Sequence, residues 1–336
     1  MRGSIASRST ADLDLPRNAE AAYTGCTAMY RLALVLLTIA GFLAAAWPAA
    51  AQDRGSNQQL PPGIVKQADV TYAEVDGREL LLDVYSREPR PERPVPVVVW
   101  VHGGGWRGGS KDRINRSLPI LDHGYGLVSV GYRLSGEAIF PAAIADVKAA
   151  FRWVRANAQR YGFDAARIGA WGSSAGGHLV ALLGTAHEVE EWDSLHEENA
   201  GVSSRPDAVC NWFGPTDFLR MNDFPGRIDH DAADSPESRF IGAPIQDHPD
   251  KVQRANPVSY VTADDPPMLH MHGENDQSVP YNQSELLHAA LQAAGLDTTL
   301  YKVSNADHGF RDMQGDTPQS LMAMVVAFFE RTIGKP

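Results

Sequence analysis

The chain has 336 residues, of which 43% are hydrophobic and 21% charged, with 30 Gly and 22 Pro. This composition is that of an ordinary globular protein, and it excludes a disordered, collagen-like or fibrous chain. The 30 Lys and Arg against 41 Asp and Glu give a formal net charge of −11, so we expect the surface to repel nucleic acid and anionic lipid headgroups.

The first part of the chain has the pattern of an export signal. An uncharged apolar run over residues 32–46 follows Arg31, and the alanines at 49–51 place small residues where a signal peptidase cleaves. The run is shorter than the about 18 residues needed to cross a bilayer core. We predict a leader over residues 1–51, with translation starting at Met29, and a periplasmic or secreted protein without a stable membrane span after cleavage.

The rest of the chain is predicted to be a polar linker over residues 52–64 and one domain over residues 65–336, because α/β folds often reach about 250 residues in a single domain. Removal of the leader takes Cys26 with it and leaves Cys210 alone, in an apolar run typical of a buried strand. We therefore expect no intramolecular disulfide in the exported domain.

The domain begins with two segments of alternating apolar residues, 70–75 and 80–85, on either side of Asp76-Gly77, and this predicts an antiparallel hairpin. Continuous apolar runs at 95–101 and 126–132 predict strands buried on both faces. Strands and helices are then predicted to alternate. The expected strands are residues 167–171, 208–213, 267–272 and 300–303, and the expected helices are residues 141–161, 178–186, 281–294 and 319–333.

This alternation predicts an α/β fold with a mostly parallel central sheet and helices on both faces. Between residues 214 and 265 the pattern dissolves into Asp, Pro and isolated aromatic residues. We interpret this segment as a short irregular insertion over the carboxyl edge of the sheet.

A candidate nucleophile follows the strand predicted at 167–171. Residues 172–176, Gly-Ser-Ser-Ala-Gly, fit the G-x-S-x-G pattern, in which small residues allow a sharp turn to present the central serine. The motif follows a predicted strand and opens a predicted helix, whose N-terminus directs backbone N–H groups at developing negative charge. Ser174 is therefore the candidate nucleophile.

A serine needs a base within reach, oriented by a carboxylate. Downstream of Ser174, Asp276 follows one late strand and His308 follows the next, in the order serine, acid, histidine. We predict that Asp276 orients the base His308. Glu274 and Asp307 are rival acids, and the Asp307 side chain is expected to point away from the adjacent imidazole.

The glycine loop after residues 95–101 offers donors for an oxyanion. His-Gly-Gly-Gly-Trp at 102–106 matches the HGGG element, and we assign the N–H groups of Gly104, Gly105 and Ala175 to the oxyanion hole. His102 is interpreted as a structural hydrogen-bonding residue.

Two other motifs compete with this interpretation. Glycines at 103, 105 and 108 satisfy a dinucleotide-binding spacing, but the next predicted strand ends at Arg133 where an acid is needed for the ribose. His270 and His272 lie on one strand face and suit zinc, but no third ligand is near in sequence. We favour buried strand histidines and expect neither a cofactor nor a metal.

Five motifs resemble secreted α/β-hydrolase esterases, and most closely the bifunctional feruloyl and acetyl-xylan esterase type related to prolyl-oligopeptidase-like hydrolases. These are HGGGW at 102–106, GSSAGG at 172–177, WFGPTDF at 212–218, GENDQSVP at 273–280 and DHGF at 307–310. The resemblance implies the α/β-hydrolase fold and cofactor-free hydrolysis of carboxylic esters, with hydroxycinnamoyl or acetyl groups on plant polysaccharide as substrates. Ser174, Asp276 and His308 match the family's triad position by position.

Aromatic and apolar residues on loops at the active edge are predicted to form the acyl pocket. These are Trp106, Trp212, Phe218, Met221, Phe224 and Phe310. Packing in the core beneath the insertion is the alternative for several of them. Two other functions stay open on the same scaffold: a serine peptidase and a non-catalytic carbohydrate-binding protein. The sequence does not reveal the oligomeric state.

Overall fold

The structure is a computed structural model that describes residues 60–224 and 226–334. The predicted leader and residues 52–59 of the predicted linker lie outside the described residues. The first strand begins at Ile64. None of the helices in these two ranges is long and apolar enough to cross a membrane.

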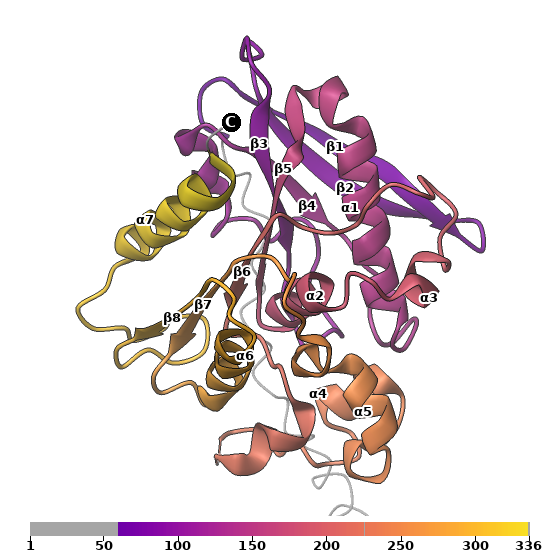
Figure 1. Ribbon diagram of the computed structural model, residues 1–336, viewed down its shortest axis with the longest axis vertical. Coiled ribbons are helices and arrows are strands. Elements are labelled where there is room, and N and C mark those ends of the chain that lie inside the picture. The colour runs from indigo at the N-terminus through magenta and orange to yellow at the C-terminus, as the bar shows by residue number, and fades with distance from the viewer. Residues whose placement is uncertain (1–59, 225, 335–336) are drawn as a thin grey trace, which may run out of the picture. The chain divides into compact units, whose positions relative to one another are not determined.

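The described residues are built around an eight-stranded sheet with the order β1-β2-β4-β3-β5-β6-β7-β8 (Figure 1). The β1–β2 and β2–β4 pairs are antiparallel, and the other neighbouring strands are parallel. The strands are β1 Ile64–Val75, β2 Arg78–Arg87, β3 Val95–Val101, β4 Gly126–Val130, β5 Phe163–Ser173, β6 Ala208–Trp212, β7 Met268–Gly273 and β8 Thr298–Val303. The prediction of a mostly parallel sheet with an antiparallel N-terminal hairpin is therefore confirmed.

The N-terminal hairpin is longer than the sequence pattern indicates. Asp76 and Gly77 have φ values of 50° and 78°, which is the backbone geometry of a tight hairpin turn. Pairing runs from this turn as far as Ile64 opposite Arg87. Residues 65–69 of β1 are exposed, so this part of the strand lacks the alternation of buried apolar residues by which a strand is recognised.

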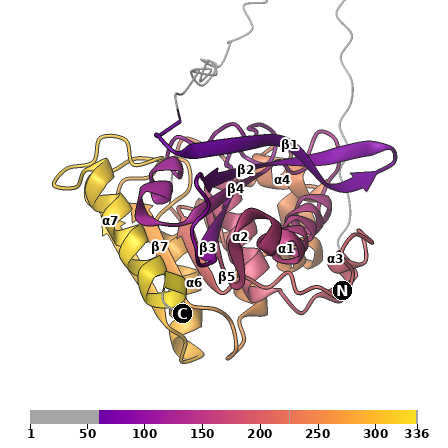
Figure 2. The same ribbon diagram turned by 90° about the horizontal axis from the view of Figure 1, so that it is seen from above.

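Helices cover both faces of the sheet. They include η1 (Leu118–His123), α1 (Ala142–Tyr161), α2 (Ala175–Thr185), α6 (Asn282–Ala293) and α7 (Pro318–Phe329). α1, α2 and α6 pack on one face, and η1 and α7 pack on the other; Figure 2 shows α1 and α7 on opposite sides. Because side chains alternate along a strand, Val97 and Val99 of β3 contact the first layer and Val98 contacts the second.

Some helix bounds differ from the prediction. α2 begins at Ala175 and not at residue 178, because the chain enters the helix directly from the turn at Ser174. The helix predicted to end at residue 333 is α7 up to Phe329, followed by a π-helical turn at Glu330–Gly334. The short helices η1 and α3 (Glu190–Asp193) were not predicted.

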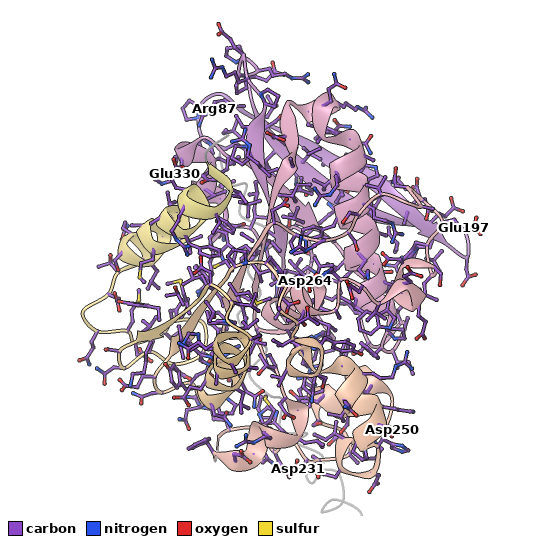
Figure 3. All side chains as sticks on the ribbon, viewed as in Figure 1. Arg87, Glu197, Asp231, Asp250, Asp264 and Glu330 are labelled. Carbon is purple, nitrogen blue, oxygen red and sulfur yellow. The ribbon has the colours of Figure 1, made fainter. Side chains whose placement is uncertain are left out.

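The insertion contains short helices where the sequence indicated irregular structure. These are η2 (Phe218–Asp223), α4 (Pro236–Ile241), η3 (Ile245–Asp247), α5 (Pro249–Ala255) and η4 (Pro257–Tyr260). α5 has seven residues, too few for a helical periodicity to emerge from the sequence. Figure 1 shows α4 and α5 grouped beyond one end of the sheet, and Figure 3 shows the exposed Asp231 and Asp250 at their outer edge.

The carboxyl ends of β3, β5, β7 and β8 carry the predicted functional loops. These ends lie at one edge of the sheet, because the four strands are parallel. The insertion contacts this edge: a Cβ added to Gly105 would lie 3.7 Å from Pro236 Cβ of α4. The topology is that of the α/β-hydrolase fold, as predicted.

Candidate active site

Ser174 occupies a sharp turn between β5 and α2. Its backbone has φ 55° and ψ −125°, a conformation that residues other than glycine rarely adopt. The Ser174 N–H donates to the Trp212 carbonyl (2.9 Å), and the Ser174 carbonyl accepts from the His178 N–H (2.9 Å). β6 and the first turn of α2 therefore hold the strained turn, which presents the hydroxyl at the edge of the sheet.

Close backbone packing explains the glycines around Ser174. A Cβ on Gly172 would collide with the Gly176 carbonyl, and a Cβ on Gly176 would collide with carbonyls at the end of β3. A Cβ on Gly103 would lie 2.6 Å from the Ser173 carbonyl oxygen and 3.1 Å from Ser174 Cβ. Because no larger residue fits these positions, the loop after β3 can lie directly against the serine turn.

His308 and Asp276 approach Ser174 in the predicted order. His308 Nε2 lies 3.0 Å from Ser174 Oγ, and His308 Nδ1 lies 2.7 Å from Asp276 Oδ2. Both distances are in hydrogen-bond range. A hydroxyl, an imidazole and a carboxylate in this order can transfer the hydroxyl proton to the ring and stabilise the resulting charge.

The Asp276 carboxylate is held from several sides. Its Oδ1 accepts the N–H groups of Ser278 (2.8 Å) and Val279 (2.9 Å), and His272 Nε2 lies 3.4 Å from Oδ2. Burial acts to raise the pKa of Asp276, but hydrogen bonds with His272 and His308 and their charges outweigh burial and hold this pKa well below its usual range. Asp276 is therefore ionised at neutral pH.

The rival acids bind other groups. Asp307 Oδ1 accepts the His308 N–H (2.7 Å), and Asp307 Oδ2 pairs with Arg227 (2.8 Å) and Arg311 (3.1 Å). This side chain turns away from the imidazole. Glu274 pairs with a lysine of β8 at 3.2 Å. Asp276 is thus the acid whose carboxylate contacts the His308 ring.

The glycine loop places backbone N–H groups beside the serine turn. Gly104 has φ 130° and Gly105 has φ 59°, and the Gly104 carbonyl accepts the Gly108 N–H (3.1 Å). Within residues 60–224 and 226–334, no protein acceptor receives the N–H of Gly104 or Gly105. Ala175 is the first residue of α2, where a backbone N–H has no intrahelical partner. These groups are available to bind a negatively charged oxygen.

Trp106 lies in the core, which corrects its assignment to the acyl pocket. Its side chain is 1% exposed, stacks on Phe240 of α4 with ring centres 4.6 Å apart, and donates from Nε1 to His178 Nδ1 (3.2 Å). His178 Nε2 in turn donates to the Ala255 carbonyl (2.7 Å). The loop position was predicted correctly, but the backbone of Trp106, with φ 55°, places the indole beneath the insertion.

The other predicted pocket residues have different environments. Phe218 and Met221 are fully buried and are also corrected to core residues, whereas Phe224 is 55% exposed. The rings of Trp212 and Phe310 contact each other edge-on, with ring centres 5.0 Å apart. Both residues line a cavity on the α7 face of the sheet. A loop position does not reveal whether a side chain faces the core or the solvent, and this explains the errors.

Two contacts of the site were not predicted. The Phe213 ring lies edge-on to the His308 ring, with ring centres 4.9 Å apart. His272 lies behind the acid, with Nδ1 2.7 Å from Ser284 Oγ and Nε2 near Asp276. The available signal was weak: Phe213 directly follows a strand, and His272 lies in the strand that precedes the acid loop.

The structure also bears on the competing motifs. A dinucleotide-binding loop opens directly into a helix; here the loop at 103–108 leads, within the described part of the chain, to η1, which begins only at Leu118. His270 Nδ1 lies 3.4 Å from Asn211 Nδ2, whereas His272 contacts the acid loop. The two histidines therefore belong to separate hydrogen-bond networks.

We predict that stability falls as the pH drops from about 6.5 to 4. Burial lowers the pKa of His102 and of His178 to about 4 and that of His270 to about 3. The unfolded chain, with histidine pKa values near 6.5, then binds more protons than the folded chain, so the free energy of unfolding decreases with falling pH, by on the order of 3 kcal/mol per histidine. Urea unfolding at pH 7, 6, 5 and 4 measures this; an unchanged free energy over that range would contradict it.

The family comparison adds to this geometry. The model of the BD-FAE family matches residues 82–291, well over half of the chain, and this range holds the glycine loop, Ser174 and Asp276. The chain belongs to the BD-FAE family. This finding agrees with the esterase resemblance of the sequence motifs.

Two curated relatives of this BD-FAE chain come from Mycobacterium tuberculosis. Esterase LipC is 32% identical over 249 residues, which is 70% of this chain and 58% of LipC. Esterase LipQ is 32% identical over 273 residues, which is 78% of this chain and 61% of LipQ. The BD-FAE chain thus spans about 60% of the length of these relatives.

Solved structures share the fold of the BD-FAE chain. A truncated carbohydrate esterase from gut microbiota is 32% identical with a TM-score of 0.68, covering 80% of this chain and 96% of the other. The butyrate-bound esterase Est2 of Thermogutta terrifontis is 26% identical with a TM-score of 0.65, and the match covers 82% of this chain and 96% of Est2. These similarities confirm the α/β-hydrolase fold.

Proposed function

We propose that this protein is a serine carboxylic-ester hydrolase that acts through an acyl-enzyme. The observation that carries the proposal is the hydrogen-bonded series from Ser174 Oγ to His308 (3.0 Å) and from His308 to Asp276 (2.7 Å), beside the glycine loop. The esterase names of LipC and LipQ support it. The reaction needs an ester, water and these groups, and we propose no cofactor.

In the first half of the reaction Ser174 is acylated. Ser174 Oγ attacks the ester carbonyl carbon while His308 Nε2 takes the hydroxyl proton, and the carbonyl oxygen becomes an oxyanion. The N–H groups of Gly104, Gly105 and Ala175 stabilise that oxyanion, and the ionised Asp276 stabilises the imidazolium. Collapse of the tetrahedral intermediate expels the alcohol, which receives the proton from His308.

In the second half water releases the acid. His308 Nε2 removes a proton from a water molecule, which attacks the acyl carbon on Ser174 Oγ. The same N–H groups stabilise the second oxyanion, and the proton returns from His308 to Ser174 Oγ as the bond breaks. The products are a carboxylic acid and an alcohol, and the side chains regain their first protonation states.

We propose short or aromatic acyl esters as substrates, among them feruloyl and acetyl groups on plant polysaccharide. The structural neighbour from gut microbiota is a carbohydrate esterase, which supports the polysaccharide part, and the butyrate bound to Est2 supports a short acyl group. An ester panel with acetyl, butyryl and feruloyl groups, scored by kcat/KM, separates these choices. A peptide anilide in the same panel tests the peptidase alternative.

The proposal predicts that a fluorophosphonate probe labels the protein once, at Ser174. The phosphorus mimics the carbonyl carbon, and the activated Oγ displaces fluoride to form a stable phosphonyl ester. Est2 phosphonylated by cyclosarin is a precedent in a 25% identical structure. Peptide mapping by mass spectrometry locates the label.

A control and the contrary outcomes complete the labelling experiment. Denatured protein serves as the control, because the hydroxyl is activated only by the folded arrangement. A folded protein that resists the probe would favour a non-catalytic carbohydrate-binding protein over the esterase, and a label on another serine would refute Ser174 as the nucleophile.

A further inference from the structure

A cavity lies on the α7 face of the sheet, beside the loop that carries His308. Its volume is about 680 Å³, within the range of small-molecule pockets. The walls come from η1 and the residues before it, from the N-terminal half of α7 and from residues 309–313, together with Trp212. Ser174, His308 and Asp276 do not line it, but Gly309 and Phe310, which directly follow His308, do, so the cavity borders the candidate active site.

The walls combine apolar side chains with a permanent positive charge. Phe310, Met313, Leu321 and Met322 contribute apolar surface. Arg116 contributes a guanidinium, and none of the described residues that line the cavity is an Asp or Glu, although the chain has 41 acidic residues. A site of this kind favours a ligand with an apolar body and one negative group.

Arg116 lacks a counter-ion within the part of the chain that the structure describes. No hydrogen bond or ion pair joins its guanidinium to another described residue, whereas the nearby Arg311 is paired with Asp307 at 3.1 Å. Arg116 is an exposed residue. Partial desolvation of its guanidinium lowers the pKa of Arg116, and the positive charge of Arg311 lowers it further. A bound anion would pair with this solvent-accessible charge.

The position of Arg116 connects the cavity with the histidine loop. A Cβ added to Gly309 would lie 3.4 Å from Arg116 Nη2, so the guanidinium lies against the residue that follows His308. The anion would therefore sit at the end of the cavity nearest the candidate active site. The apolar body would then extend along α7 toward Met322.

We infer that this cavity binds a small monocarboxylate with an apolar tail. The planar guanidinium of Arg116 would hold the carboxylate through two parallel hydrogen bonds, and the tail would be buried against Met313, Leu321 and Met322. The inference does not rest on the proposed function, because binding requires no turnover. If that function holds, the ligand belongs to the chemical class of the acid product.

Titration calorimetry on the full chain tests the inference with phenylacetate and its neutral counterpart phenylacetamide. We expect phenylacetate to bind at least about tenfold more tightly, because its carboxylate forms charge-assisted hydrogen bonds with the guanidinium and the neutral amide does not. Arg116→Gln should abolish the preference for the acid, and Arg116→Lys should retain part of it. Ala323→Trp, at an exposed position of α7 on the cavity wall, should weaken binding of both compounds.

The matched control is Arg220→Gln, which removes an exposed arginine of η2 that pairs with Asp223 at 2.7 Å. This variant should bind both compounds as the unaltered chain does. Equal binding of acid and amide by the unaltered chain, or binding of neither, would overturn the inference. So would an acid preference that survives Arg116→Gln, or binding that Ala323→Trp leaves unchanged, since the acid would then occupy another place, such as the candidate active site at Ser174.

Discussion

Replacing Ser174 by alanine is expected to lower the turnover of ester substrates by about 10⁶-fold, the loss seen when a serine hydrolase is deprived of its nucleophile. Without Oγ no covalent bond to the acyl group forms, and the remaining groups can only bind the substrate and polarise its carbonyl. The measurement is kcat on p-nitrophenyl acetate, with residual activity compared against the buffer reaction.

The fold should survive the Ser174→Ala change. The Ser174 N–H and carbonyl hold the turn through Trp212 and His178, and alanine keeps both backbone groups. Circular dichroism and the melting temperature check this. Ser173→Ala is the matched control, because Ser173 is the neighbouring serine and lies outside the series formed with His308; it should keep activity within about tenfold. Near-normal hydrolysis by Ser174→Ala would refute the nucleophile assignment.

Short motifs with fixed geometry can be predicted from the sequence. The pattern around Ser174 predicted the turn because the close contacts at Gly172 and Gly176 exclude larger residues. Asp276 and His308 were found because each directly follows a parallel strand, and such strands present their carboxyl ends at one edge. The fold class followed from the same alternation of strands and helices.

Contacts that depend on the folded path of the chain cannot be predicted from the sequence. The inward orientation of Trp106 depends on Phe240 and His178, which lie 134 and 72 positions further along the chain. The helices of the insertion are too short to display a period. His272 and Asp276 are only four residues apart, but their contact depends on how the chain turns after β7, which no sequence pattern indicates. The position of Arg116, which no described residue pairs, becomes evident only when η1, α7 and the histidine loop are assembled.

Replacing Asp276 by asparagine should lower turnover by about 10⁴-fold, the loss measured for the equivalent change in the serine-protease template. Asp276 Oδ1 accepts the N–H groups of Ser278 and Val279, so the oxygen of an asparagine must occupy that place to satisfy both donors. The amide NH₂ then faces His308 Nδ1 and donates to it. This places the ring proton on Nε2, which faces Ser174 and can no longer accept the hydroxyl proton.

Asp307→Asn is the matched control for the Asp276→Asn change, because it alters a neighbouring acid in the same way. The pairs of Asp307 with Arg227 and Arg311 involve half-exposed arginines, and such pairs contribute about 0–1 kcal/mol to stability. Even if all of this energy were lost from the transition state, turnover would change by less than tenfold. The asparagine oxygen can still accept the His308 N–H. Turnover of both variants on one ester, with melting temperatures measured in parallel, therefore separates the two acids. A greater loss in Asp307→Asn than in Asp276→Asn would transfer the orienting role to Asp307.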